Sequence, residues 1–434
     1  MSVDYTIYVR KIAVIGAGYV GLTTAACFVK MGHQVTLSEI DHSKADLIRG
    51  GISPIFETGL SELLSAGISS GRLSVTQSNS EAVSDSEFIF VCLPTPQDAD
   101  GSVDTTIVFE VISSIASVLT SNSILITKST MPIGSVKKIQ ILVQDQGTVV
   151  ATNPEFLREG TAIQDTLHPE RIVIGCDDRE SADQIADLYR SLNSQILITD
   201  PQSAELIKYA SNAFLATKVT FINSIATLCD AVGADIASVS NALGSDSRIG
   251  NKFLKPGPGW GGSCFPKDTS ALLHLSTEHG HSFGLLDAVI SSNFDHQLEI
   301  VRQISSQLSE SGGNRIAALG LTFKAGTDDL RDSPALFILQ ELVKLGIEVN
   351  AYDPTVLAES SDLFQNIEIC SSINDAAEST DLLVILTEWS EFSQLNPTEL
   401  SGLMNVNRVF DTRGVIDKET WMEAGFTVKI LGRP

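Results

Sequence analysis

A glycine-rich turn near the start of the chain sets the strongest limit on its fold. The stretch "KIAVIGAGYVGLTTAACFVKMGHQVTLSEID" begins with an apolar run at 12–15 and passes through Gly16, Gly18 and Gly21 into a helical pattern. A second apolar run then ends at Glu39. This order of strand, tight turn, helix, strand and acidic residue is the fingerprint of a dinucleotide-binding βαβ unit.

The same stretch predicts which dinucleotide binds. Its glycines let the backbone approach a pyrophosphate, which the N-terminus of the following helix stabilises. Glu39 can accept hydrogen bonds from the adenosine ribose and would repel a 2′-phosphate. We therefore expect NAD as the cofactor rather than NADP.

Three further apolar runs, each followed by polar residues, extend this pattern. They are "SEFIFVCLPTP" (86–96), "SILITKSTMPIGS" (123–135) and "VVATNPEFLREGTAIQD" (149–165). Ligands bind at the carboxyl ends of such strands, so Thr95, Ser129 and Thr130 are candidates to contact the cofactor or a reacting group. Glu155 and Glu159, four residues apart, would share a face of a helical turn. They are either solvated or placed so that one acts as a base.

A long helix is predicted over 203–232, ending at Gly233, because apolar residues recur there at three- and four-residue spacing. Its length suits a helix that bridges two domains and offers a dimer surface. Lys208 and Asn212 project from one face of it. They are either solvated, or they supply the positive charge and the amide donor that stabilise an oxyanion.

The stretch "GWGGSCFPKD" (259–268) places Cys264 where a glycine-rich loop meets Pro266. Proline favours the first turn of a helix, and a helix N-terminus favours a thiolate, so Cys264 is a candidate nucleophile. The alternative is a small buried apolar residue. Asp268, four residues later, gives the cysteine a carboxylate neighbour. The cations around this loop, Arg248, Lys252, Lys255 and Lys267, suit an anionic ligand.

The last third repeats strand, loop, helix and strand over 315–354 without a GxGxxG motif. Ser333 can cap the helix that follows. In this last third of the chain, the candidate cations for binding a nucleotide phosphate are Lys324, Arg331 and Arg413. The fold class is therefore α/β, with two Rossmann-like doubly wound parallel sheets joined by the long helix. We expect an NAD-binding domain at 1–200, a central helical dimerisation domain at 201–310 and a mononucleotide-binding domain at 311–434, for which the resemblance described below implies a UDP sugar.

Composition excludes some partners. A formal charge of -24 argues against nucleic acid and anionic membranes, which would repel most of the protein. The six cysteines have neither metal-site nor disulfide-scaffold spacing, so we expect no metal and a reducing cytoplasm. The opening "MSVDYTIYVR" lacks the apolar core of a signal peptide.

Seven motifs together resemble the UDP-glucose 6-dehydrogenases of bacteria. They are "GAGYVGL", "PTP", "KSTMPIGS", "NPEFLREGTA", "AELIKYASNAFLA", "FLKPGPGWGGSCFPKD" and "GLTFKAGTDDLRDSPA", in the expected order from Lys11 onward. The family oxidises C6 of UDP-glucose twice with NAD and yields UDP-glucuronate. It folds as two Rossmann-like domains joined by a long helix that dimerises, so a homodimer is implied.

The resemblance implies roles for residues noted above. Cys264 matches the nucleophile that carries a thiohemiacetal and then a thioester. Lys208 and Asn212 match the oxyanion stabilisers, and Asp268 the partner of that lysine and of the attacking water. Thr130 and Glu155 match groups that position water or move protons.

Binding residues are implied in the same way. Cofactor contacts match Gly16, Gly18, Val20, Gly21, Glu39, Lys44, Thr95, Thr130, Glu159, Lys267 and Arg331. Substrate contacts match Glu155, Phe156, Leu157, Arg158, Glu159, Lys208, Asn212, Phe253, Leu254, Lys255, Pro256, Gly257, Gly261, Lys324 and Arg413.

The chain departs from the family pattern at Glu39, Trp260, Thr58 and Met131, where Asp, Phe, Pro and Val are usual. None of these changes removes a chemical group, but Trp260 borders the sugar loop and so puts sugar tolerance in doubt. The alternatives are the same chemistry on GDP-mannose or a UDP-N-acetylhexosamine, a two-electron dehydrogenase, and a catalytically silent nucleotide-sugar-binding protein.

Overall fold

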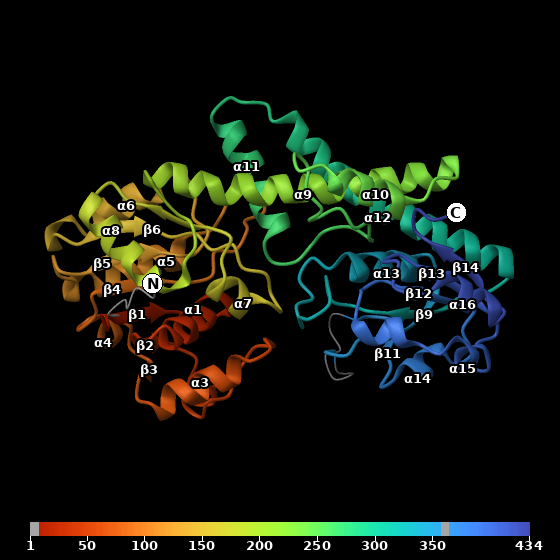
Figure 1. Ribbon diagram of the computed structural model, residues 1–434, viewed down its shortest axis with the longest axis horizontal. Coiled ribbons are helices and arrows are strands. Elements are labelled where there is room, and N and C mark those ends of the chain that lie inside the picture. Colours follow the sequence, from red (N-terminus) through yellow and green to blue (C-terminus); the bar gives the residue numbers. More distant parts are fainter. Residues whose placement is uncertain (1–7, 357–363) are drawn as a thin grey trace, which may run out of the picture. The chain divides into compact units, whose positions relative to one another are not determined.

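The computed structural model describes residues 8–356 and 364–434 (Figure 1). The opening segment that was tested for a signal peptide therefore lies mostly outside the described residues. The chain divides into two units, residues 1–211 and residues 212–434. The three predicted domain boundaries stay a prediction beside this two-part division.

The first unit is built on an eight-stranded sheet with the order β3-β2-β1-β4-β5-β6-β7-β8. The neighbours from β3 to β6 are parallel, as predicted for a doubly wound sheet. Strands β7 and β8 are parallel to each other. Unexpectedly, β7 pairs with β6 in the antiparallel direction, with Thr152 opposite Gly175. The strands are β1 Lys11–Ile15, β2 Gln34–Ser38, β3 Leu73–Thr76, β4 Phe88–Val91, β5 Ile124–Thr127, β6 Val149–Thr152, β7 Ile172–Gly175 and β8 Ile196–Thr199.

Both faces of this sheet are covered by helices, as the burial of β1 shows. Alternate residues of β1 point to opposite faces and belong to two different clusters of buried residues. Ile12 and Val14 lie in one cluster of buried residues, and Ala13 and Ile15 lie in another. This pattern explains why the strands of a parallel sheet appear in the sequence as continuous apolar runs. The helices are α1 Tyr19–Lys30, α2 His42–Arg49, α3 Leu60–Ser69, α4 Asn79–Val83, α5 Thr106–Ile115, α6 Ser135–Leu142, α7 Ala162–Leu167 and α8 Arg179–Leu188.

The second unit contains a six-stranded sheet with the order β11-β10-β9-β12-β13-β14, in which all neighbours are parallel. Ser333 caps α13 as predicted, because its side chain accepts a hydrogen bond from Leu336 N–H and Pro334 follows it. The elements are β9 Arg315–Leu319, α13 Pro334–Lys344, β10 Glu348–Tyr352, β11 Ile367–Ile369, α14 Ile373–Ala377, β12 Leu382–Ile385, α15 Pro397–Ser401, β13 Arg408–Asp411, α16 Lys418–Glu423 and β14 Thr427–Ile430.

Four helices lie between the two sheets in the sequence. They are α9 Pro201–Val232, α10 Ile236–Ser245, α11 Phe265–Glu278 and α12 Gly284–Ser311. The long helix α9 begins two residues before the predicted start and ends at Gly233, whose φ of 76° is a left-handed value that glycine adopts without strain.

By length and composition, α9 is the one helix in the described part of the chain that could cross a membrane. It nevertheless carries five buried polar side chains, Glu205, Lys208, Asn212, Thr220 and Asn223, each hydrogen-bonded within its own unit. These bonds are typical of a helix that packs inside protein, where buried polar groups find partners.

Candidate active site

The three glycines of the first turn have different surroundings. Gly16 has φ 94°, and a Cβ there would lie 2.8 Å from the carbonyl oxygen of Cys92. A Cβ on Gly21 would lie 1.9 Å from the carbonyl oxygen of Gly16, so this glycine lets α1 pack against the turn. A Cβ on Gly18 would meet no described atom within 4 Å. Gly18 therefore borders open space at the start of α1.

This turn fits the pyrophosphate and ribose of NAD. Gly18 is the N-cap of α1, and among the described residues no side chain caps this helix end. Its first N–H groups and the positive end of the helix dipole are thus available to an anion. Glu39 follows β2 and accepts hydrogen bonds from Ala17 N–H (3.2 Å) and Asp41 N–H (2.9 Å), which places its carboxylate beside the turn.

The segment after β6 holds a buried ion pair. Glu155 Oε1 lies 2.6 Å from Lys208 Nζ, and the two side chains are 7% and 4% exposed. Lys208 Nζ also donates to the Glu155 carbonyl oxygen at 2.8 Å, and Leu157 N–H donates to Glu155 Oε2 at 2.7 Å. Residues 153–158 are not helical, so Glu155 and Glu159 do not share a helical face as the spacing suggested.

The charge of Glu155 is set by this pair. Burial acts to raise the pKa of Glu155, but the charge and hydrogen bond of Lys208 lower it overall, helped by Leu157 N–H and the charge of Lys128. Glu155 is therefore ionised and Lys208 neutralises it. Phe156 lies under the lysine, with Lys208 Nζ 5.7 Å from the ring centroid.

In the second unit, Cys264 is the N-cap of α11, and Pro266 stands in the first turn of that helix, as the sequence indicated. Its side chain is partly exposed and lies 3.5 Å from Ser263 Oγ. Burial instead raises the pKa of the Cys27 and Cys92 thiols to about 12 each, so these two cysteines are inert. Cys264 alone combines partial exposure with a helix N-terminus among the described cysteines.

Asp268 lies one turn after Cys264 and is fully buried. Its backbone N–H donates to the Cys264 carbonyl oxygen at 2.8 Å, while its Oδ2 accepts from Asn212 Nδ2 at 2.6 Å. Lys267 Nζ lies 3.3 Å from the other carboxylate oxygen. The side chains of Asp268 and Asn212 are thus bonded to each other one helical turn after Cys264. The Asn212 amide has a second N–H that can serve another acceptor.

Buried polar side chains of α9 and α12 form hydrogen bonds with the backbone of the loop at 253–260. Gly257 N–H donates to Asn223 Oδ1 at 2.9 Å, and His296 Nε2 lies 2.8 Å from the Gly257 carbonyl oxygen. Asn293 exchanges two hydrogen bonds with the backbone of Trp260. Phe253, in the same loop, has φ 62°, a left-handed value that costs a non-glycine residue energy and often marks a binding site.

This loop meets the nucleotide-fold part of the same unit at two glycines. A Cβ on Gly257 would lie 2.7 Å from Arg413 Nη1, and a Cβ on Gly261 would lie 1.9 Å from the carbonyl oxygen of Asp332. Of the predicted substrate residues, Gly257 therefore lies against Arg413, whereas Gly261 lies against the backbone just before α13. Arg413 is also paired with Glu388, at 3.1 Å.

The segment after β9 begins like the first turn of the chain, but its acidic residue has different hydrogen-bond partners. Gly16 and Gly320 both have φ 94°, and each donates its N–H to the end of the second strand, at Ser38 and Tyr352. Asp353 corresponds to Glu39 and accepts Leu321 N–H at 2.8 Å. Asp353 also accepts from Thr322 and from Trp389 Nε1 and is 2% exposed, so its carboxylate is used by the protein itself.

Other predicted residues lie at strand ends and loops. Thr95 Oγ1 donates to the Thr130 carbonyl oxygen at 3.1 Å, which joins the ends of β4 and β5. Exposed Lys44 lies in the first turn of α2. Arg158 is paired with Asp165 and Arg331 with Asp329. The remaining predicted contacts, Val20, Leu157, Leu254, Lys255, Pro256 and Lys324, lie in or beside the segments already described.

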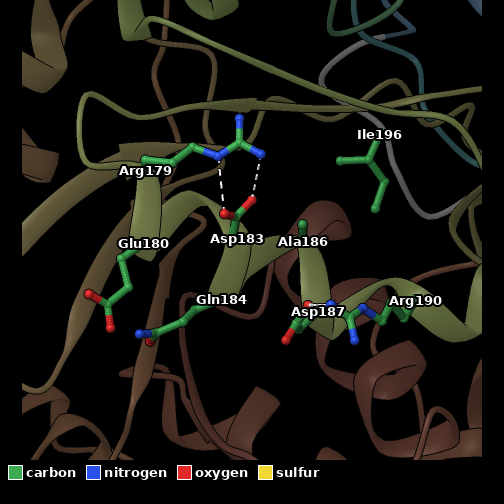
Figure 2. Close-up of a pocket in the computed structure, with 8 residues that line it drawn as sticks. All are labelled: Arg179, Glu180, Asp183, Gln184, Ala186, Asp187, Arg190 and Ile196. Carbon is green, nitrogen blue, oxygen red and sulfur yellow. Dashed lines mark hydrogen bonds and ion pairs between the residues drawn. The ribbon is translucent and has the colours of Figure 1, made fainter. Parts of the chain in front are cut away.

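A surface hollow of about 780 Å³ on α8 is unrelated to these clusters, because it contains none of the predicted site residues. Figure 2 shows Arg179 turned toward Asp183 of the same helix, and Arg190, which lies just after the end of α8, turned toward Asp187. Arg179 pairs with Asp183 at 2.9 Å and Arg190 with Asp187 at 2.6 Å. The charges are thus balanced locally, which leaves no free cation in the hollow for an anionic ligand.

Sequence reasoning missed the side chains that support the site. Asn293 and His296 stand three apart in α12, and both are buried. Buried polar residues on the face of a helix were a usable signal, since such groups need partners. Tyr19 and Glu57 were also missed, and they bind a segment far away in the sequence.

Three sequence models of the UDP-glucose/GDP-mannose dehydrogenase family match consecutive parts of the chain. The NAD binding domain matches residues 10–193, the central domain 202–295 and the UDP binding domain 317–418. These matches agree with a dinucleotide turn in the first unit and a second nucleotide fold at the end of the chain.

Individual relatives match nearly the whole chain. The UDP-glucose 6-dehydrogenase TuaD of Bacillus subtilis (strain 168) is 40% identical over 98% of this chain and 94% of its own length. The UDP-glucose 6-dehydrogenase of Rhizobium meliloti (strain 1021) is 40% identical over 98% of this chain and 100% of its own. A solved UDP-glucose dehydrogenase from Pyrobaculum islandicum is 32% identical, with a TM-score of 0.89 over 99% of this chain and 98% of its own.

The turn glycines give a matched pair of variants. We expect Gly21→Ala to destabilise the protein by about 1–3 kcal/mol, because its methyl group would overlap the Gly16 carbonyl oxygen. We expect Gly18→Ala to change stability by less than about 0.5 kcal/mol and to weaken NADH binding at least about tenfold, by blocking the helix N-terminus. Urea unfolding and NADH fluorescence titration measure the two effects. Wild-type NADH affinity in Gly18→Ala would contradict this assignment.

The Glu155–Lys208 pair predicts a pH dependence of stability. In the native protein, the lowered pKa of Glu155 contributes stability above its ordinary pKa of 4.5 that is lost as the pH falls. In Lys208→Met, burial still raises the pKa of Glu155 but the lysine that lowers it is gone. Ionisation of the buried Glu155 carboxylate therefore reduces the free energy of unfolding as the pH rises. We expect a loss of about 3 kcal/mol near pH 8 that shrinks near pH 5.

Urea unfolding at both pH values tests this expectation. The double variant Lys208→Met/Glu155→Gln should lose the pH dependence, because it has no buried carboxylate at this place. Lys137→Met, which removes an exposed lysine of α6, should match the native protein at both pH values. A loss in Lys208→Met that is equal at the two pH values would contradict the ion-pair argument.

Proposed function

The chain belongs to the UDP-glucose/GDP-mannose dehydrogenase family, and we propose that it is a UDP-glucose 6-dehydrogenase, which oxidises C6 of UDP-glucose to the carboxylate of UDP-glucuronate with NAD. The observation that carries this proposal is the cluster of a partly exposed Cys264 at a helix N-terminus, with Asp268 and Asn212 bonded one turn away. A protein that only binds a nucleotide sugar has no use for such a nucleophile.

NAD, when bound, accepts a hydride from a carbon atom that carries oxygen. In the proposed reaction, loss of one hydride from C6 and of the hydroxyl proton to a carboxylate leaves an aldehyde, to which the Cys264 thiolate adds. The resulting alkoxide takes up a proton and becomes a thiohemiacetal, which gives up that proton again when the second hydride leaves. Loss of a second hydride turns this adduct into a thioester. Water then attacks the thioester carbonyl, the C–S bond breaks, and the acid and the free thiol are released. The covalent bond explains how the aldehyde is retained between the two oxidations.

The other residues act on charges and protons. The Lys208 charge and the second Asn212 N–H suit the stabilisation of oxygen anions at C6. Asp268 and ionised Glu155 suit the acceptance of protons from water or alcohol, with Thr130 positioning the water. For binding, we propose the turn glycines, Glu39 and Glu159 for NAD, and the segments 155–159 and 253–257 with Gly261, Lys324 and Arg413 for UDP-glucose.

We also propose a homodimer formed by the exposed side of α9. The large apolar side chains Phe214, Phe221 and Leu228 recur every seven residues there and are 66%, 52% and 53% exposed. Such a stripe in water marks a surface that another molecule covers. The seven-residue spacing suits a second copy of the same helix, because it keeps the stripe on one face along its length.

We place this activity in the cytoplasm. All six cysteines are free thiols in the described structure. A catalytic thiol needs a reducing compartment in which it is not lost to disulfides.

The proposed chemistry predicts the stoichiometry of the reaction. The purified protein should form two NADH for each UDP-glucose consumed. We expect Cys264→Ala to form no UDP-glucuronate and to bind UDP-glucose with an affinity within about threefold of the native protein, since the thiol serves chemistry rather than binding. Absorbance at the NADH band, product analysis and calorimetry measure the three quantities. Cys370→Ala, at a cysteine distant in sequence, is the matched control.

Several outcomes would overturn the proposal. Acid formation by Cys264→Ala would remove the covalent role. One NADH for each sugar would indicate a two-electron dehydrogenase, and turnover of GDP-mannose or a UDP-N-acetylhexosamine instead of UDP-glucose would change the substrate.

The dimer has its own test. Phe221→Glu places a charge in the middle of the stripe, so we expect it to shift the native mass to that of a monomer. Phe221→Leu keeps an apolar side chain and should leave the dimer intact. Light scattering coupled to gel filtration measures the mass, and a monomeric native protein would contradict the proposal.

A further inference from the structure

Two side chains outside the predicted site bind the end of the segment that contains Glu155 and Glu159. Tyr19 is the first residue of α1, directly after the glycine turn, and its hydroxyl donates to the Glu57 carboxylate. Gly160 N–H in turn donates to Tyr19 Oη at 2.6 Å and to Glu57 Oε2 at 2.8 Å. These three groups link the dinucleotide turn to residue 160, which is 141 positions away.

Glu57 also fixes the start of α7. Its second oxygen accepts Ile163 N–H at 3.3 Å, in the first turn of that helix. The side chain is 8% exposed, and in the described part of the chain it forms no ion pair. Its partners are N–H and O–H donors, so Glu57 acts as an acceptor for three segments. Burial and the neighbouring carboxylate raise the pKa of Tyr19, which keeps the hydroxyl protonated as the donor.

The opposite end of the segment is held independently. Asn153 Oδ1 accepts from Lys128 Nζ at 2.9 Å and from the Tyr189 hydroxyl at 2.5 Å. Glu155 is held by Lys208. Loss of the bonds at Gly160 would therefore disturb the 159–160 backbone while Glu155 stays in place.

We propose that Tyr19 and Glu57 are positioning residues for cofactor binding, which hold Glu159 and Gly160 beside the first turn of α1. Tyr19 is fixed by the same helix start that faces the cofactor, so its hydroxyl sets the separation between that helix start and the 159–160 backbone. The inference rests on the proposed function only in assigning NAD to this unit and Glu159 to its contacts.

The experiment measures NADH binding without any sugar, by fluorescence titration of the full chain. Tyr19→Phe keeps the ring and removes the hydroxyl, so we expect the Kd for NADH to rise about tenfold. Glu57→Gln turns an acceptor into a donor that faces N–H groups, so its rise should be larger. In turnover, the KM for NAD should rise by a similar factor, while kcat at saturating NAD and the KM for the sugar change much less, because Glu155 stays in place.

Two exposed positions provide matched controls. Tyr8→Phe and Glu62→Gln make the same chemical changes at exposed side chains and should leave the Kd for NADH unchanged. Thermal unfolding of all four variants separates stability from binding. A native Kd in both Tyr19→Phe and Glu57→Gln, or a fall in Tm with no change in Kd, would overturn the inference.

The proposed function can fail separately. If the native protein binds NADH but oxidises no UDP-glucose, a raised Kd in Tyr19→Phe still supports the positioning role. If Tyr19→Phe lowers kcat and leaves the Kd for NADH and the KM for NAD unchanged, the role is not in cofactor binding and the inference is wrong.

Discussion

The need to satisfy the buried polar side chains of one apolar helix organises much of this protein. Along α9, Glu205 accepts N–H groups of Gly134 and Val136, and Lys208 pairs with Glu155. Asn212 bonds Asp268, and Asn223 bonds Gly257. A buried polar group without a partner costs about 1–3 kcal/mol, so each pairing fixes a loop in a defined place. Glu205 and Lys208 thus hold loops of the first unit, and Asn212 and Asn223 hold loops of the second.

Features that depend on neighbouring residues in the sequence could be predicted, whereas contacts between segments far apart in the sequence could not. The glycine turn, the Ser333 cap, the helix start after Cys264 and the bounds of α9 are local, and all appear nearly where predicted. The reversed pair β7–β8 and the Tyr19–Glu57–Gly160 contact join segments that no local pattern connects. The expected helical turn at 155–159 was wrong, because Glu155 instead bonds Leu157 N–H and Lys208 within a segment that has no helical structure.

Backbone geometry at the loop 253–262 indicates how tightly the second unit is built there. Phe253 and Asp332 both have left-handed φ values, 62° and 47°. The carbonyl oxygen of Asp332 occupies the space that a side chain on Gly261 would need. Strain of this kind persists only where the surroundings determine the conformation, and here they do so through Asn223, Asn293 and His296. Polar contacts hold this loop together with the buried apolar side chains of Leu254 and Trp260.

The two nucleotide folds use one frame with different ends. Each has a glycine at φ 94° after its first strand and an acidic residue after its second, but Glu39 borders an open turn whereas Asp353 is consumed by Leu321, Thr322 and Trp389. The acidic residue after the second strand therefore has a different structural role in each fold. With Glu39 proposed as a contact of the cofactor ribose, a substitution there is expected to change nucleotide affinity, whereas a substitution at Asp353 is expected to change whether its loop forms at all.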